Sequence, residues 1–430
     1  MPNIPSRVRD PVSTRPGFAL GVLTGINALN YLDRFLVAPL LPLIIAGLGL
    51  RDRQAGLLQS AFILVFALTC PLAGWLGDRV SRLRIAALGV ALWSLATFAS
   101  GLASAFAWLL LARALVGVGE ATYTVVTPSL LADHYPSEKR GRALSIFYAA
   151  MPFGIAIGYV LGGQIGAHYG WRPAFFLAGG PGLLCALALL ALREPERGRF
   201  DTAAEPAPRP ALAELMRTLA GRPSFFFNMA AQTIYTFTMG GLGAWMPTYF
   251  VRERHLGVDR AGTVFGALLL AAGFLGTIVG GQVGDRLARR FRGAHFVFSA
   301  GTLLASVPFA ALAVLAPQPC VYWPAMGIAL FCLFLIYGPL NAALVNVLPS
   351  HARARGIGLH TTTIHLFGDA FSPFLIGLAS DAVGLRIPVL VTGLLVALSG
   401  VLLLVGRRAF VADLEAAGGV PVEAGRVQTP

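Results

Sequence analysis

Charged residues are scarce in this sequence. Only 12% of its 430 residues are charged, whereas a soluble globular domain has about 25%, and 56% are hydrophobic. Apolar stretches recur from residue 17 to about residue 406, and many exceed the roughly 20 residues that cross a bilayer as a helix. The composition excludes a soluble globular protein and indicates a polytopic membrane protein.

Lysine and catalytic motifs are also missing. Lys139 is the only lysine and Arg140 follows it, so the chain has no G-x-x-x-x-G-K-[ST] phosphate-binding loop. It contains neither H-E-x-x-H nor G-x-S-x-G, which argues against an enzyme. The four cysteines lie in apolar segments without C-x-x-C spacing, so we expect no disulfide framework, no metal site and no cofactor.

The apolar stretches predict an all-α fold of twelve transmembrane helices. Their expected ranges are 17–46, 53–77, 83–104, 106–133, 140–169, 173–192, 223–251, 259–285, 293–315, 320–349, 355–384 and 387–406. Of the 33 basic residues, 24 then fall on the side of the N-terminus, seven on the other side and two within spans. This asymmetry predicts an inner-membrane protein with both termini in the cytoplasm. The net charge of +13 therefore reflects topology, and we expect no nucleic-acid partner.

Two short motifs occur twice. "GWLGDRVSRLR" and "GQVGDRLARRFR" each follow an even-numbered span, and "YPSEKRGR" matches "LPSHARAR" further along. The repeat predicts bundles at 17–192 and 223–408, a linker at 193–222, and cytoplasmic tails at 1–16 and 409–430. The linker is charged and rich in proline and alanine, so we expect a flexible segment with one short surface helix. The matched motif residues are Gly74, Gly77, Asp78, Arg79, Gly281, Gly284, Asp285 and Arg286.

Two six-helix halves with G-x-x-x-D-R motifs resemble the major facilitator superfamily of secondary transporters. The resemblance implies two bundles that rock around a central site and expose it to each side in turn. Asp78 could cap a helix end across the halves and Arg79 could pair with it. We expect these motifs to gate the cytoplasmic side; the alternative is a basic loop that only sets topology.

Four charged residues lie deep in the first half, namely Asp33, Arg34, Arg113 and Glu120. A charge near the middle of a bilayer costs about 2.5–3.5 kcal/mol on insertion scales, so each needs a partner or a water-filled cavity. Asp33 with either arginine, and Glu120 with the other, would form two ion pairs or one network of four. We expect a proton-coupling cluster; a static network that fixes helix packing is the alternative.

The second half has no deep lysine or arginine. Thr361, His365 and Asp369 recur every fourth residue on one expected helix, and Tyr337 with Asn341 marks the helix before it. Because histidine titrates near neutrality, His365 with Asp369 is a second candidate proton site or ligand contact. An ordinary hydrogen bond between helices is the alternative.

Three motifs resemble the spinster family: "NYLDRF" (30–35), "RALVGVGEATY" (113–123) and "HLFGDAFSP" (365–373). The resemblance implies proton-coupled export of lysophospholipids or sphingosine phosphates. It implies coupling and headgroup binding by Asp33, Arg34, Arg113 and Glu120, beside the second candidate proton site of His365 and Asp369. Expected substrate contacts are Asn30, Arg34, Arg113, Glu120, Tyr123, Tyr337, Asn341, Thr361 and His365.

Two other cargoes fit the same fold. "NYLDR" also occurs in branches that carry small organic anions such as sugar acids, and a drug exporter is the other candidate. The expected partners are the bilayer, protons and an amphipathic lipid or organic anion, and we expect a monomer.

Overall fold

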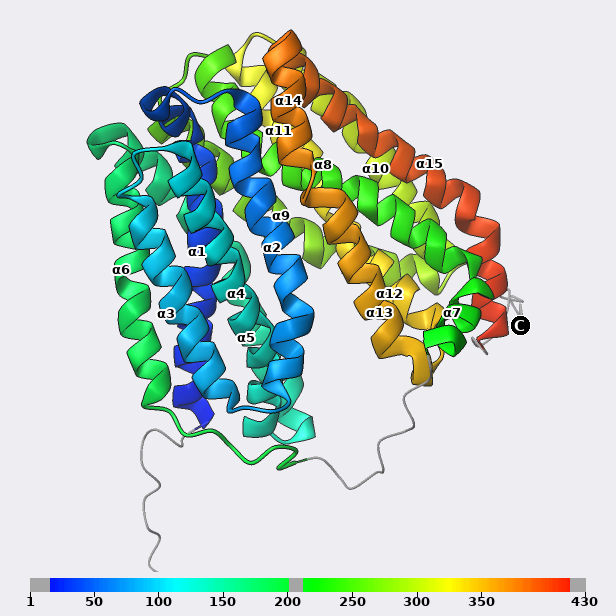
Figure 1. Cartoon of the computed structure of the whole chain (residues 1–430). Coiled ribbons are helices and arrows are strands. Elements are labelled where there is room, and N and C mark those ends of the chain that lie inside the picture. The colour runs from blue at the N-terminus through cyan, green and yellow to red at the C-terminus, as the bar shows by residue number, and fades with distance from the viewer. Residues whose placement is uncertain (1–15, 201–211, 418–430) are drawn as a thin grey trace, which may run out of the picture.

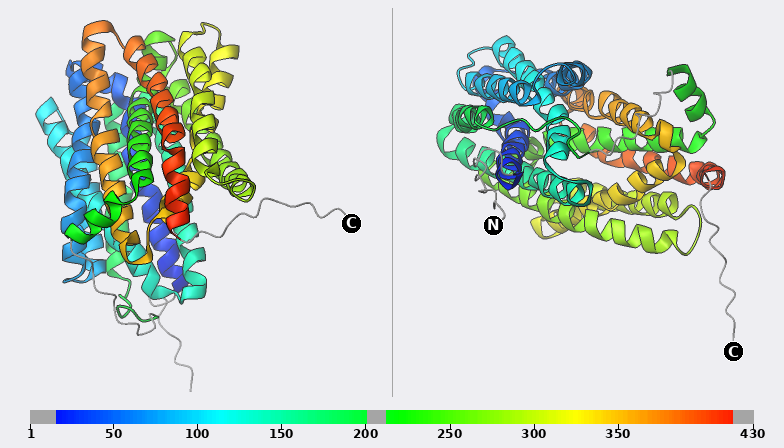
Figure 2. Two further views of the ribbon diagram at one scale, coloured as in Figure 1. Left: turned by 90° about the vertical axis from the view of Figure 1, so that its right-hand side faces the viewer. Right: turned by 90° about the horizontal axis from the view of Figure 1, so that it is seen from below.

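The computed structural model describes residues 16–200 and 212–417, and every regular element in these ranges is a helix. The remaining parts of the predicted tails and linker, at 1–15, 201–211 and 418–430, lie outside the described residues. Helices α1–α6 form the N-terminal half and α8–α15 the C-terminal half, and the two halves lie side by side when viewed from below (Figure 2). The predicted fold of two bundles is confirmed.

Six long helices build the N-terminal half (Figure 1). They are α1 (Pro16–Leu48), α2 (Asp52–Gly77), α3 (Arg82–Ser100), α4 (Phe106–His134), α5 (Ser137–Tyr169) and α6 (Trp171–Leu190). The C-terminal half repeats this pattern with two of its spans interrupted. Its elements are α8 (Pro223–Glu253), α9 (Val258–Ala288), α10 (Ala294–Leu315), α11 (Pro319–Phe334), α12 (Tyr337–Val347), α13 (Ser350–Ile364), the π-helix η2 (His365–Asp369), α14 (Ser372–Val383) and α15 (Arg386–Ala416).

The two interruptions correct the expectation of unbroken helices at 320–349 and 355–384. Each lies four residues before a proline, Pro339 or Pro373, where the ring would clash with the carbonyl of residue i−4. α11 therefore ends before Leu335. In the second span the backbone widens into η2, in which the Ala370 amide donates to the His365 carbonyl at 3.1 Å.

Within the described residues, eleven helical stretches are long and apolar enough to span a membrane. α11 joins α12 in one of these stretches, and residues 355–383 form another. The remaining long helix, α8, is less apolar because it carries several polar side chains. Some of these side chains form hydrogen bonds with neighbouring helices. Asn228 donates to the Leu340 carbonyl at 3.1 Å, and Thr238 donates to the Thr392 carbonyl at 3.2 Å. α8 is thus the twelfth span, with its polar groups satisfied inside the bundle.

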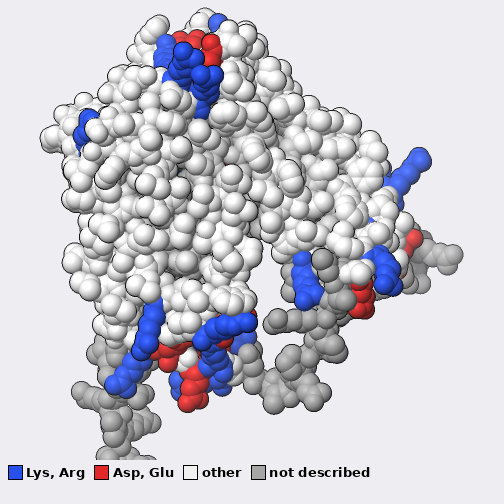
Figure 3. Space-filling model, viewed as in Figure 1, with Lys and Arg blue, Asp and Glu red and all other residues white. Residues whose placement is uncertain are grey.

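The halves meet at one end of the molecule and separate at the other. We call the end with the α1–α2 loop the closed end, and the end with the α2–α3 loop the open end. One hydrophobic core at the closed end draws on both halves, through residues such as Leu40, Tyr159, Trp245 and Phe265. At the open end each half has its own core. Figure 3 shows the molecule hollowed between the halves from the open end, with arginine side chains beside the hollow.

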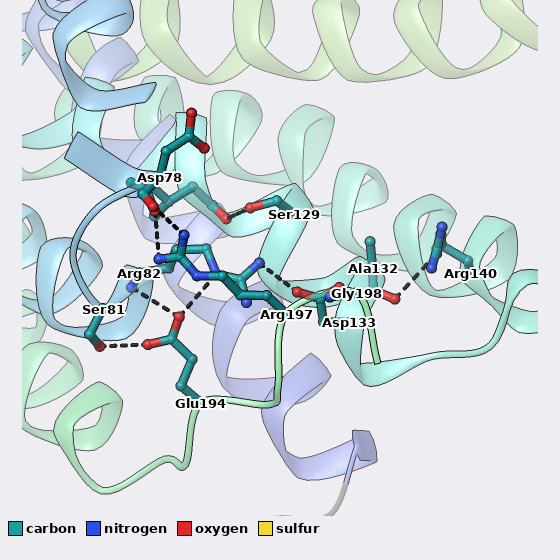
Figure 4. A network of polar contacts seen from close by, with 12 residues as sticks. Asp78, Ser81, Arg82, Ser129, Ala132, Asp133, Arg140, Glu194, Arg197 and Gly198 are labelled. Carbon is teal, nitrogen blue, oxygen red and sulfur yellow. Dashed lines mark hydrogen bonds and ion pairs between the residues drawn. The ribbon is translucent and has the colours of Figure 1, made fainter. Parts of the chain in front are cut away.

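The described ends of the predicted linker contact the two halves, and its middle, residues 201–211, lies outside the described residues. Glu194 accepts hydrogen bonds from Ser81 at 2.5 Å and from the backbone and side chain of Arg82 at 3.1 and 3.0 Å (Figure 4). Arg197 donates to the carbonyls of Gly77, Asp78 and Val80. At the other end lies the expected short helix, α7 (Leu212–Ala220), whose Leu215 and Leu219 are buried in the core of the C-terminal half.

Candidate functional site

The central contact of the candidate site is an ion pair between α1 and α4. The Arg34 guanidinium donates to Glu120 Oε2 from Nε at 3.1 Å and from Nη2 at 2.9 Å. The Glu120 side chain is fully buried, whereas that of Arg34 is 19% exposed. The rings of Tyr31, Phe62 and Phe66 surround the Arg34 guanidinium at 4.6–5.2 Å from their centroids. Arg34 therefore lies at the edge of the N-terminal half in an aromatic environment.

Asp33 points in another direction, into the bundle. It is buried, and its Oδ2 accepts a hydrogen bond from Thr97 on α3. Its Oδ1 has no hydrogen-bond partner in the described part of the chain, and neither has either amide atom of the fully buried Asn30. These unsatisfied atoms make the interior beside α1 unusually polar for a membrane bundle.

Arg113 is the most unusual residue of the site. Its side chain is fully buried, yet none of its three guanidinium nitrogens has a hydrogen-bond partner among residues 16–200 and 212–417. The guanidinium lies 4.7 Å from the Phe62 centroid, and the charges of Asp33 and Glu120 are close enough to act on it. A buried charge without hydrogen bonds is costly, so this position favours an anionic partner.

The structure brings the four predicted charges together but corrects their expected pairing. Only Arg34 and Glu120 form a direct ion pair, while Asp33 bonds to Thr97 and Arg113 contacts an aromatic face. The sequence predicted that both carboxylates would pair. Asp33 follows Asn30 by one helical turn and faces α3, so its nearest donor is a hydroxyl rather than Arg34 beside it.

The predicted residues of the C-terminal half lie across the cleft. The His365 Nδ1 is 3.0 Å from Asp369 Oδ2 within η2, with 48% and 19% of the side chains exposed. Asp369 and His365 lie within electrostatic reach of Arg34, and Tyr337 within reach of Tyr31. Charged and aromatic groups of both halves therefore face the same space.

The other predicted substrate contacts, Tyr123, Asn341, Thr361 and Tyr337, lie in different surroundings from one another. Tyr123 is fully buried and donates to the Leu23 carbonyl at 2.6 Å, which ties α4 to α1. Asn341 donates to the Tyr337 carbonyl of its own helix at 2.8 Å and is exposed, as is Thr361 one turn before His365. Tyr337 packs edge-on against Tyr235 and stacks on Phe334.

The repeated glycine–aspartate–arginine motifs lie at the open end. Asp78 is the C-cap of α2, and within the described residues its carboxylate has no hydrogen-bond or ion-pair partner. Arg79 instead contacts the ring and carbonyl of Trp75. Asp285 and Arg286 lie in the last turn of α9 and are exposed. The expected contact of Asp78 across the halves is therefore absent in this conformation, in which the two open-end cores are separate.

Sequence reasoning missed a polar latch at the closed end. Asp52 on α2 accepts from Arg252 of α8 at 2.7 Å and from Ser380 of α14 at 2.6 Å, while its backbone amide donates to Asp381 at 2.8 Å. Beside it, the Phe374 amide donates to Ser60 at 3.1 Å. We call Asp52, Arg252, Ser380 and Asp381 the closed-end latch. Asp52 belongs to the N-terminal half and the other three to the C-terminal half, so each of these contacts joins the two halves.

Known proteins resemble this chain in sequence. The sequence profile of the Major Facilitator Superfamily matches residues 23–368. The chain is 34% identical over 395 residues to protein spinster homolog 1 of Homo sapiens, covering 85% of this chain and 73% of that one. It is 33% identical over 391 residues to the sphingosine-1-phosphate transporter SPNS2 of Danio rerio, covering 85% and 76%.

Solved structures give the same result. A bacterial homologue of the human lysosomal transporter spinster, in an inward-facing and unoccupied conformation, superposes with a TM-score of 0.84 at 25% identity, covering 93% of this chain and 98% of that one. The nucleoside transporter NupG has a TM-score of 0.70 at 13% identity over 92% of this chain and 99% of its own, and shares the fold.

Proposed function

The chain belongs to the spinster family of the Major Facilitator Superfamily, and we propose that it is a proton-coupled exporter of an anionic amphipathic lipid with one hydrocarbon chain, such as a lysophospholipid or a sphingosine phosphate. It is a membrane transporter and not an enzyme. One observation carries the proposal. The fully buried Arg113 guanidinium lacks a hydrogen-bond partner in the described part of the chain and lies near the Arg34–Glu120 pair.

The headgroup would bind between the two arginines. A phosphate offers oxygens to a planar guanidinium in two directed, charge-assisted hydrogen bonds, and it would satisfy Arg113 while Arg34 approaches from the cleft. The relative named as a sphingosine-1-phosphate transporter supports a lipid phosphate as the cargo. Aromatic rings on both sides would hold an apolar tail, with Tyr31 and Phe66 in one half and Tyr337 in the other.

Protons would be coupled through Glu120. The charges of Asp33, Arg34, Arg113 and Glu120 sum to zero, so an incoming phosphate adds net negative charge to a site with little solvent. Protonation of Glu120 would cancel this charge and release Arg34 from its ion pair. Proton and anion should therefore favour each other's binding and cross in the same direction, so export would follow the lipid's own gradient and an outward proton gradient would speed it. Asp33 is the second candidate proton site, and the His365–Asp369 pair is the third.

Alternating access would exchange the open and closed ends. The open end carries most of the basic loops, and this arginine asymmetry supports a cytoplasmic open end and thus an inward-facing conformation in the inner membrane. We propose that the closed-end latch separates in the outward-facing state. The motif residues Asp78 and Arg79 would then contact the C-terminal half, which they do not touch here.

Flux from proteoliposomes tests the coupling. Glu120→Gln should abolish gradient-driven transport while the protein stays folded, because a neutral amide neither binds a proton nor pairs with Arg34. If binding is cooperative, an inside-acid gradient should speed outward flux. The matched control is Glu253→Gln, which removes an exposed carboxylate at the closed end and should transport normally. Normal gradient-driven transport by both Glu120→Gln and Asp33→Asn would refute the assignment.

Binding of a chain-length series tests the cargo. Arg113→Lys keeps the charge but loses the planar fork, so phosphate binding should weaken, and Arg113→Ala should weaken it further. Each methylene removed from the tail should cost up to about 0.8 kcal/mol, or about fourfold in affinity. Affinity that ignores tail length, together with tight binding of a sugar acid, would instead assign the chain to carriers of small organic anions.

A further inference from the structure

A second apolar site lies on the outside of the N-terminal half, between α3 and α6. It is a groove of about 270 Å³ lined almost entirely by carbon atoms. α3 and α6 pack against each other and against other N-terminal helices, so the groove is separate from the cleft between the halves (Figure 1). Its lining residues are Ala87, Leu88, Ala91, Leu183, Ala186, Leu187 and Leu190.

The shape of the groove follows from its residues. Three alanines form the floor, and Ala87 and Ala186 are buried, whereas Leu88, Leu187 and Leu190 are 72%, 64% and 61% exposed and form the rims. From Leu183 to Leu190 the groove runs about 10 Å along α6 at a rise of 1.5 Å per residue. This length and composition fit part of one acyl chain.

Two arginines flank the open-end mouth of the groove. Arg84 lies one helical turn before Leu88 on the same face of α3, and Arg193 follows Leu190, the last residue of α6. The two segments are in contact, because Glu194 bonds to Ser81 and Arg82. Both arginines are exposed, and neither forms an ion pair within the described residues. Glu194, the carboxylate beside them, is already engaged by its own partners.

We propose that this groove binds an anionic phospholipid of the bilayer, with an acyl chain along α6 and the phosphate between Arg84 and Arg193. α3 and α6 are both candidate membrane spans, so the groove would face the hydrocarbon and the two arginines at their open ends would reach the headgroup level. Basic pockets between transmembrane helices on the cytoplasmic side suit anionic headgroups, and each nearby arginine contributes about fivefold in affinity. A zwitterionic lipid could fill the groove, but it would gain less from the two cations.

Native mass spectrometry of the full-length protein in neutral detergent tests this site with phosphatidylglycerol and phosphatidylcholine of identical chains. The parent protein should retain phosphatidylglycerol preferentially. The double variant R84Q/R193Q should bind it about 30-fold more weakly, equivalent to about 2 kcal/mol, with phosphatidylcholine unchanged. Ala91→Leu fills the groove without changing charge, so it should weaken retention of both lipids.

The matched control is R217Q/R408Q, which removes two exposed arginines from the open end of the C-terminal half. This control should leave lipid retention unchanged. An equal loss in the control would mean that net charge alone attracts the lipid and would overturn the site. Unchanged retention in R84Q/R193Q would overturn the headgroup assignment, and unchanged retention in Ala91→Leu would overturn the groove.

Discussion

Removing the Asp52 carboxylate should release the closed end. In this conformation Asp52 accepts from Arg252 at 2.7 Å and from Ser380 at 2.6 Å, and both donors belong to the other half. Both hydrogen bonds end on the charged Asp52 carboxylate, and a hydrogen bond to a charged group contributes about 1.5–3 kcal/mol. The Asp52 side chain is only 12% exposed, but that of Arg252 is 32% exposed, which favours the lower part of the range.

We therefore expect Asp52→Ala to destabilise the closed-end contact by about 2–3 kcal/mol. This corresponds to a shift of about 30- to 150-fold in the ratio of closed to separated closed ends. Arg252→Gln removes the same ion pair without altering the first turn of α2, so it should shift the ratio in the same direction. Together the two variants distinguish loss of the latch from fraying of α2.

Pulsed electron paramagnetic resonance measures this ratio directly. Spin labels at Leu102 and Gln318 report the closed end, and labels at Arg142 and Arg408 report the open end, in a background without native cysteines. We expect a longer distance to appear at the closed end and a shorter one at the open end. Asp259→Asn is the control, because it removes a carboxylate at the same end that, within the described residues, has no hydrogen-bond or ion-pair partner in the other half. Unchanged closed-end distances in both variants, or an equal change in the control, would refute the role of the latch.

Three further predictions concern other contacts. Partial burial raises the pKa of the Glu194 carboxyl, but hydrogen bonds from Ser81 and Arg82 outweigh this and place it below its usual value of 4.5. The contacts of Glu194 with Ser81 and Arg82 should thus contribute about 1 kcal/mol to the free energy of unfolding above pH 4.5, and this contribution should be lost as the pH falls further. Melting curves of Glu194→Gln and the parent protein should therefore converge in acid. Gly56→Ala should favour separation of the closed end, because a Cβ there would lie 2.1 Å from the Pro373 carbonyl; accessibility of a closed-end cysteine should rise. Asp78→Asn should leave this conformation unchanged and weaken the opposite one, so open-end label distances should shift further toward separation.

The helices could be predicted because lipid leaves a spanning segment few alternatives to an α-helix. The clash of a proline ring with residue i−4 explains the breaks before Pro339 and Pro373. It could not have predicted them, since Pro128, Pro152 and Pro247 lie inside unbroken helices. α8 was identified as a span by its length and flanks, although its polar side chains reduce its hydropathy. The packing of these side chains against α12 and α15 explains why this reading was correct.

The candidate site was predictable in composition but not in geometry. Charge in an apolar segment was enough to select Arg34, Arg113 and Glu120. Their pairing depends on side-chain directions and on residues without any periodic signal, such as Thr97 on a neighbouring helix. The closed-end latch could not be predicted from the sequence. Asp52 looks like an ordinary acidic residue in the first turn of a helix, and its partner Ser380 is 328 residues away.

The polar character of α8 also affects the order in which the protein can be built. During synthesis α8 leaves the ribosome well before the helices that satisfy it, since Asn228 bonds to Leu340 and Thr238 to Thr392. An unsatisfied amide costs several kcal/mol in hydrocarbon, so α8 alone is a poor substrate for lateral release from the translocon. We therefore expect stable insertion of the seventh span to wait for α12, which supplies the Leu340 carbonyl to Asn228, whereas Thr238 also donates to the Ile234 carbonyl of its own helix. The N-terminal half has the same requirement, because the side chains of Asp33 and Arg34 on α1 find their hydrogen-bond partners in Thr97 of α3 and Glu120 of α4.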